Sequence, residues 1–189
     1  LNDIGSRSVN EGQNLNFFVS ASDADGTALT LTATASLPLG ATFTGYGNNT
    51  GRFNWTPNFT QSGSYNITFY ASDGIDLDSE QVTITVNNVN RPPVLAPIGP
   101  KSTAENALLA FNVTATDPDT TIPVLTTSAL PTGATLTSSN GTGSFRWTPT
   151  FEQAGAYNVT FYASDGALID SERVVITVTN VNRPPILEP

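Results

Sequence analysis

Hydrophobic residues alternate with Thr, Ser and Asn along most of the chain. Successive side chains of a β-strand point to opposite faces of a sheet, so this alternation predicts strands with one buried face. No stretch shows a sustained 3.6-residue period, and we expect no helix longer than a turn or two. In the first half, the positions predicted to share an inward face are Phe17, Val19 and Ala21; Leu29, Leu31 and Ala33; Phe53 and Trp55; Tyr65, Ile67, Phe69 and Ala71; and Val82, Ile84 and Val86.

The second half of the chain repeats the first. Residues 51–57 (GRFNWTP) recur as residues 143–149 (GSFRWTP), and residues 69–74 (FYASDG) recur unchanged as residues 161–166. Residues 88–93 (NVNRPP) return at 180–185. The repetition indicates two copies of one structural unit. The inward positions expected in the second copy are Phe111, Val113 and Ala115; Phe145 and Trp147; Tyr157, Val159, Phe161 and Ala163; and Val174, Ile176 and Val178.

Clusters of Gly, Pro, Asp and Asn divide each copy into about seven short strands, as a two-sheet sandwich requires. We therefore predict an all-β protein with two tandem immunoglobulin-like (Ig-like) or cadherin-like β-sandwich domains, residues 1–92 and 93–184, joined by a short Pro-Pro linker. Consecutive prolines favour an extended, semi-rigid linker. Residues 185–189 are expected to begin a third repeat, because residues 187–189 (LEP) resemble residues 95–97 (LAP).

The composition argues against catalysis. The chain has no His and no Cys, so Cys-His nucleophiles, Ser-His-Asp triads and the usual zinc clusters cannot be assembled from it. We expect no enzymatic activity.

The charge limits the partners. The net charge of −9 repels nucleic acid and anionic lipid, so neither is an expected partner, whereas cations are. No segment approaches the ~18 apolar residues of a membrane span, and we expect no direct membrane insertion. Because Leu1 follows neither a start Met nor a signal peptide, the chain is expected to be mature or part of something longer.

Several short motifs allow a family to be named. They are residues 9–12 (VNEG), 21–26 (ASDADG), 37–41 (LPLGA), 53–57 (FNWTP) and 63–65 (GSY) in the first copy. Each copy resembles the Ig-like and dystroglycan-type cadherin-like domains of bacterial and archaeal surface proteins, over essentially the whole chain. The resemblance implies an extracellular or cell-surface location and is not specific for one function.

The aromatic residues have structural interpretations. Residues 61–65 and 153–157 look like the tyrosine corner of Ig sandwiches, in which a phenol hydroxyl ties down a loop. Trp55 and Trp147 lie on the inward phase of a strand, which favours core packing over a sugar-stacking platform. Tyr46 is the better candidate for an exposed aromatic, but the second copy lacks it.

The resemblance to calcium-binding cadherin repeats also implies a metal site. The residues that match it are Glu11, Asn88, Asn90, Asp117, Asp119 and Asp165, whose oxygens suit interdomain Ca²⁺. Arg91 and Arg183 stand where that family has an additional Asp, and the mid-domain acidic motif is missing unless Glu152 replaces it; Thr60 stands there in the first copy. At most a reduced site is implied.

Alternatives without metal remain open for these residues. Asp117-Pro118-Asp119 suits a simple turn, because Asp and Pro both favour turns. Glu11 and Glu105 are, in this alternative, solvated surface residues.

Asn-x-Thr sequons are a second chemical signal. Seven are present, against about 2.7 expected by chance from 18 Asn and 28 Thr. Asn54 is a poor acceptor because Pro57 follows its Thr. The candidate N-glycosylation sites are Asn48, Asn58, Asn66, Asn112, Asn140 and Asn158, and the alternative is that Thr-rich outer faces create sequons by accident.

Three functions fit these observations. The chain is expected to be a structural module of an extracellular surface protein, filament or S-layer-like array, acting as a semi-rigid spacer or adhesion stalk. Alternatives are a calcium-stiffened spacer of an adhesin and an accessory carbohydrate-binding domain of a secreted hydrolase. Expected partners are neighbouring repeats of the same protein, with lateral self-association through an edge strand such as residues 15–21 as a further expectation.

Overall fold

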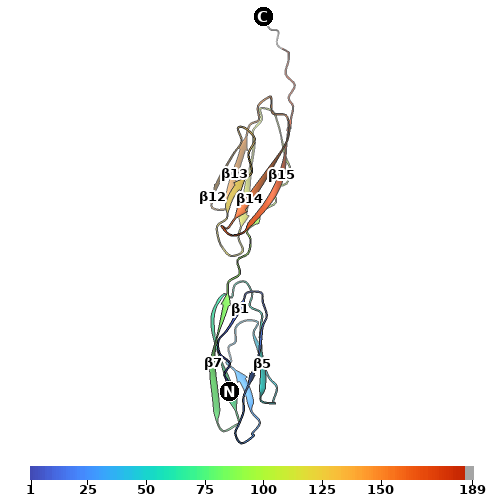
Figure 1. The fold of residues 1–189 in the computed structure, drawn as a ribbon. Helices are drawn as coiled ribbons and strands as arrows, with labels where there is room; N and C mark the ends of the chain where they lie inside the picture. The colour runs from blue at the N-terminus through green and yellow to red at the C-terminus, as the bar shows by residue number, and fades with distance from the viewer. Residues whose placement is uncertain (186–189) are drawn as a thin grey trace. The chain divides into compact units, whose positions relative to one another are not determined.

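A computed structural model describes residues 1–185, so the predicted start of a third repeat, residues 185–189, lies outside the described residues except for Pro185. The chain divides into two units, Leu1–Val89 and Asn90–Pro189 (Figure 1). All regular structure in residues 1–185 is β, which confirms the predicted fold class. The division lies close to the boundary expected after residue 92.

Unit 1, Leu1–Val89, is a sandwich of two sheets. One sheet has the order β1-β7-β6-β3 and the other has the order β2-β5-β4. β1 pairs in parallel with β7, and the other neighbours in both sheets are antiparallel. The strands are β1 (Arg7–Asn10), β2 (Leu15–Ser20), β3 (Thr30–Ala33), β4 (Thr42–Gly45), β5 (Thr50–Trp55), β6 (Gly63–Ser72) and β7 (Leu77–Asn87).

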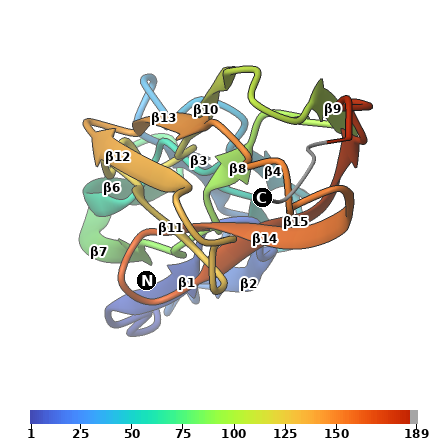
Figure 2. The same ribbon diagram turned by 90° about the horizontal axis from the view of Figure 1, so that it is seen from above.

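Unit 2, Asn90–Pro189, repeats this arrangement with one additional two-residue strand, β8. Its sheets have the orders β9-β15-β14-β11 and β8-β10-β13-β12, and in Figure 2 β13 and β15 lie on opposite sides of the unit. The strands are β8 (Val94–Leu95), β9 (Lys101–Ala104), β10 (Leu109–Thr116), β11 (Val124–Thr127), β12 (Thr135–Ser139), β13 (Thr142–Trp147), β14 (Gly155–Ser164) and β15 (Ile169–Thr179).

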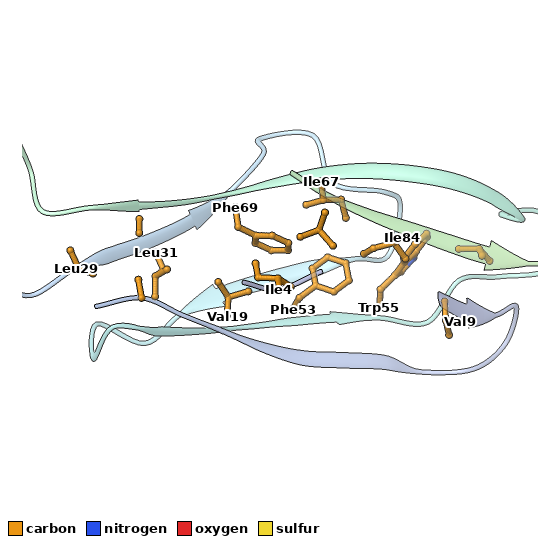
Figure 3. Close-up of a cluster of buried hydrophobic side chains, with 14 residues drawn as sticks. Ile4, Val9, Val19, Leu29, Leu31, Phe53, Trp55, Ile67, Phe69 and Ile84 are labelled. Atoms are coloured by element: carbon orange, nitrogen blue, oxygen red, sulfur yellow. The ribbon is translucent and has the colours of Figure 1, made fainter. Parts of the chain in front are cut away.

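The inward faces of the strands form one core in each unit, as the alternation predicts. Figure 3 shows Phe53 and Trp55 pointing from one sheet of unit 1, and Ile67 and Phe69 from the other, into the same space. The register is repeated, since Phe17 lies opposite Phe53 on β5, and their counterparts Phe111 and Phe145 face one another in unit 2.

The two tryptophans occupy equivalent interior positions, which confirms that they belong to the core. Both are fully buried, and each packs edge-on against a tyrosine, with 4.9 Å between the ring centroids of Trp55 and Tyr65 and of Trp147 and Tyr157. Each indole N–H donates a 3.2 Å hydrogen bond to a loop carbonyl, that of Leu39 or Thr132. The polar atom of each ring is therefore satisfied inside the core.

The tyrosine corners form as predicted. The hydroxyl of Tyr65 donates a hydrogen bond to the carbonyl of Gln61 at 2.9 Å, and that of Tyr157 donates to the carbonyl of Gln153 at 3.0 Å. Each hydroxyl fixes the loop that leads into the long strand β6 or β14.

Candidate functional site

Glu11 and Glu105 are buried carboxylates that hold the chain segment at the C-terminal end of their own unit. The side chain of Glu11 accepts hydrogen bonds from the backbone N–H groups of Ser62 at 2.9 Å and Val89 at 3.0 Å. Glu105 accepts one from the N–H of Val181 at 2.7 Å. Only 2% of Glu11 and 4% of Glu105 is exposed. The alternative that both are solvated is therefore wrong, because backbone donors take the place of water around them.

A second pair of glutamates holds the segment at the N-terminal end of each unit. Glu80 on β7 accepts hydrogen bonds at 3.0 Å from the N–H groups of Ile4 and Gly5. Glu172 on β15 does the same at 2.8 Å for Ile98 and Gly99. Neither glutamate was predicted to be an anchor, although Asp-Ser-Glu recurs at residues 78–80 and 170–172.

Aspartates two residues earlier extend this contact. The carboxylate of Asp170 accepts a 2.8 Å hydrogen bond from the N–H of Leu95. The equivalent Asp78 accepts one from the amino group of Leu1, and this interaction lowers the pKa of Asp78 below its usual value. Each unit therefore fastens both ends of its own chain with carboxylates.

Three of the predicted metal ligands gather around Arg91 in unit 2. The amide of Asn90 donates a 2.8 Å hydrogen bond to Asp165. The backbone N–H of Arg91 donates to one carboxylate oxygen of Asp119 at 2.6 Å, and its guanidinium donates to the other oxygen at 2.9 and 2.6 Å. The guanidinium also reaches the carbonyl of Pro118 at 2.7 Å. Hydrogen bonds from the Arg91 side chain and backbone hold the pKa of Asp119 below its usual value.

Asp117 and Asp165 are fixed by turns beside this group. One oxygen of Asp117 accepts a 2.7 Å hydrogen bond from the N–H of Asp119, which forms the predicted Asp-Pro-Asp turn. Its other oxygen is buried and has no hydrogen-bond partner among the described residues. Asp165 accepts bonds from the N–H groups of Leu168 at 2.6 Å and Ala167 at 2.7 Å, which lower its pKa.

The predicted calcium ligands are thus divided between the two units. Asn90, Asp117, Asp119 and Asp165 lie together in unit 2, whereas Glu11 and Asn88 belong to unit 1. Within residues 1–185 no group of three or more Asp, Glu, His or Cys has a metal-binding arrangement. The ion pair between Arg91 and Asp119 was not predicted, because Arg91 was interpreted only as a departure from the cadherin pattern. Calcium binding stays a prediction.

The asparagines of the candidate glycosylation sites are accessible. All six are exposed, and Asn66 on β6 and Asn158 on β14 each lie between two inward-facing residues. The side-chain oxygen of Asn58 accepts hydrogen bonds from both the N–H, at 2.9 Å, and the hydroxyl, at 2.8 Å, of Thr60 in its own sequon. Glycosylation of these residues stays a prediction.

The exposed aromatic side chains of residues 1–185 are Phe18, Tyr46 and Phe59, all in unit 1. Tyr46 is exposed, as expected, and so is Phe18, which has the guanidinium of Arg52 6.0 Å from its ring centroid. In unit 2 the register position of Phe18 is occupied by Asn112. Among residues 1–185 there is also no helix that is long and apolar enough to cross a lipid bilayer.

Two-sheet sandwiches with matching cores and tyrosine corners define a pair of tandem Ig-like domains. The sequence profile of the family described as "Putative Ig domain" matches residues 1–88 and again residues 92–180, and the chain belongs to this family. This confirms the resemblance seen in the sequence.

One relative and two solved structures are similar to this chain. Chitinase A of Pseudoalteromonas piscicida is 34% identical over 120 residues, which span 61% of this chain and 14% of that protein. An endo-fucoidan hydrolase of glycoside hydrolase family 107 is similar in structure, with a TM-score of 0.45, 20% identity and coverage of 96% of this chain and 28% of the other. A titin fragment in complex with telethonin has a TM-score of 0.46, 12% identity and coverage of 94% of both chains.

Proposed function

We propose that this chain is a non-catalytic, semi-rigid spacer in an extracellular multidomain protein. The observation that carries the proposal is the repeated pair of carboxylates that fastens each unit to its own flanking chain, Glu11 with Glu80 in unit 1 and Glu105 with Glu172 in unit 2. Chain segments bonded to the body of a domain have little freedom to bend. A module built in this way transmits spacing to whatever is attached at its ends.

The side-chain inventory supports a non-catalytic role. The chain lacks His and Cys throughout, and both tryptophans are buried in the cores. Most exposed polar residues are Thr, Ser and Asn, which suit a solvated surface that holds other domains apart. The spacer function needs no ligand site.

The relative named as a chitinase supports the setting. This chain matches a segment that makes up 14% of that protein, as expected of one module among several. We infer an extracellular location, in a secreted polysaccharide hydrolase or in a surface protein, filament or S-layer-like array. The six exposed sequons agree with this location.

Solution scattering of the two-unit chain tests the spacer role. We expect the wild type to give a narrow distribution of particle lengths, and Glu11→Ala to broaden it because Val89 loses its anchor. The matched control is Glu152→Ala, at a side chain that is 81% exposed. A wild-type distribution as broad as that of Glu11→Ala would overturn the proposal. Lengthening of the particle with Ca²⁺, reversed by EGTA, would support the calcium-stiffened alternative instead.

A carbohydrate-binding role is a second candidate, favoured by the match to a chitinase. It requires an exposed aromatic contact, for which Tyr46, Phe18 and Phe59 are the exposed aromatic side chains of residues 1–185. Retention of the chain on chitin beads, abolished by Tyr46→Ala or Phe18→Ala, would establish it. Passage of the wild type through the beads unretained would leave the spacer role.

A further inference from the structure

The N-terminal end of unit 1 carries the same acidic turns that hold Asn90 and Arg91 in unit 2. We call Asp23, Asp25 and Asp73 the acidic socket; by repeat position and turn geometry they correspond to Asp117, Asp119 and Asp165. A pocket of about 190 Å³ lies here, and its lining includes Asp23 and Asp73 as well as Asp76 and Asp78.

The turns of the socket share the main hydrogen bonds of those in unit 2, and Asp23 accepts one more, from the N–H of Thr27 at 3.0 Å. The N–H of Asp25 donates to the carboxylate of Asp23 at 2.9 Å, as that of Asp119 does to Asp117 at 2.7 Å. Asp73 accepts hydrogen bonds at 2.7 Å from the N–H groups of the second and third residues that follow it, the same pattern as Asp165. The socket is therefore preformed in the conformation that binds a linker in unit 2.

The carboxylates of the socket lack the partners that their counterparts have. Asp119 is 10% exposed beneath Arg91, whereas Asp25 is exposed and accepts no hydrogen bond from the described residues of unit 1. The second oxygen of Asp165 binds the amide of Asn90, whereas no described residue of unit 1 donates to the second oxygen of Asp73. Carboxylate oxygens that lack a donor favour a cation.

We propose that the acidic socket binds the Asn-Arg-Pro-Pro linker of another copy of the repeat, joined head to tail, with the arginine on Asp25 and the asparagine on Asp73. This inference rests on the proposed spacer function and names its partner. The chain carries that linker twice, at residues 90–93 and 182–185.

The second linker has the properties that such docking requires. Arg183 is 53% exposed and pairs at 3.0 Å with Glu152, itself 81% exposed. The guanidinium of Arg183 also lies 4.6 Å from the centroid of the Phe151 ring. Exposed ion pairs are weak, so the pair with Glu152 can be exchanged at little cost. A bidentate arginine–carboxylate contact of the kind seen between Arg91 and Asp119 is the stronger alternative.

The test adds residues 88–94 (NVNRPPV) in front of Leu1 of the full chain. The matched control carries the same extension with its arginine replaced by alanine, so both lose the amino-terminal charge at Leu1. We expect the arginine form to shift the backbone amide signal of Asp25 in NMR spectra. Hydrogen exchange at the N–H of Asp25, which donates to Asp23, should slow about tenfold, the size expected of one added charge-assisted hydrogen bond.

The substitution Asp25→Asn should remove the difference between the two extensions, and because Asp25 is exposed the fold should tolerate it. Equal spectra and equal exchange rates for the two extensions would overturn the proposal. The scattering test of the spacer role depends on Glu11 and Val89 at the other end of unit 1, so failure of one proposal is distinguishable from failure of the other.

Discussion

The two units have equivalent cores but differ at their N-terminal ends. In both, the centroids of the tryptophan and tyrosine rings lie 4.9 Å apart. The hydrogen bond that the indole N–H donates to a loop carbonyl is 3.2 Å long in both. In unit 2 the acidic turns hold Asn90 and Arg91, whereas the same turns in unit 1 hold no arginine of the described chain. The comparison teaches that the repeated pattern specifies the interior, and that a few linker residues decide the electrostatics of the ends.

The largest expected effect tests the equality of the cores. Trp55→Ala and Trp147→Ala should each lower the free energy of unfolding of their own unit by about 3–5 kcal/mol, because each leaves a cavity and an unpaired carbonyl. Circular dichroism during urea denaturation measures the altered unit, and the remaining tryptophan reports the other. A clear inequality between the two losses would break the comparison of the cores.

Removal of the buried glutamates should cost somewhat less. Glu11→Ala leaves two backbone N–H groups without their acceptor, and we expect a loss of about 2–3 kcal/mol in unit 1. Glu105→Ala leaves one N–H group without its acceptor, that of Val181, so the loss in unit 2 should be smaller. Chemical denaturation measures both, with Glu152→Ala as the exposed control; a loss no larger than the control's would contradict the anchoring role.

The substitution Arg91→Ala tests the difference between the ends. It removes the guanidinium from Asp119, and the melting temperature of unit 2 should fall by about 4–8 °C. Arg52→Ala is the matched control, because Arg52 makes one side-chain hydrogen bond, to Asn16. Differential scanning calorimetry measures the shift, and a fall equal to that of the control would remove Arg91 as an anchor.

The acid dependence of stability should sharpen the same difference. The pKa of Asp119 is lowered in the folded state, mainly by the side chain of Arg91, so its contribution is present above the unfolded pKa of about 3.9 and is lost as the pH falls through the folded value. Unit 2 should therefore lose stability below about pH 4. In Arg91→Ala this loss should be smaller, as measured by urea midpoints at pH 7, 4 and 3; an unchanged acid dependence would argue against the pairing.

The smallest effect is expected at the exposed aromatic residue. Tyr46→Ala should change the free energy of unfolding by less than about 0.5 kcal/mol, because the ring lies largely in solvent. A larger loss, measured by urea denaturation, would show that Tyr46 stabilises unit 1 through contacts that have no counterpart in unit 2.

Much of the fold could be predicted from the sequence, and the site could be predicted only in part. Alternation placed Phe53, Trp55 and Phe69 inside correctly because a strand has only two faces. The burial of Glu11 could not be predicted, since a lone Glu beside Gly looks the same whether water or backbone N–H groups surround it. The pairing of Arg91 with Asp119 was also missed, because Arg91 lies 28 positions away and the antiparallel pairing of β8 with β10 brings the two together.

The sequence by itself determined two tandem β-sandwiches with aromatic cores. The alternation of hydrophobic and polar residues and the internal repeat can both be read directly from the order of residues. Only the tertiary structure decided which carboxylates are anchors: Glu11, Glu80, Asp119 and their counterparts bind backbone or side-chain donors that are distant in sequence. The physical reason is that burial of apolar surface follows from a periodic pattern, whereas a hydrogen bond requires two specific groups to meet in a defined geometry.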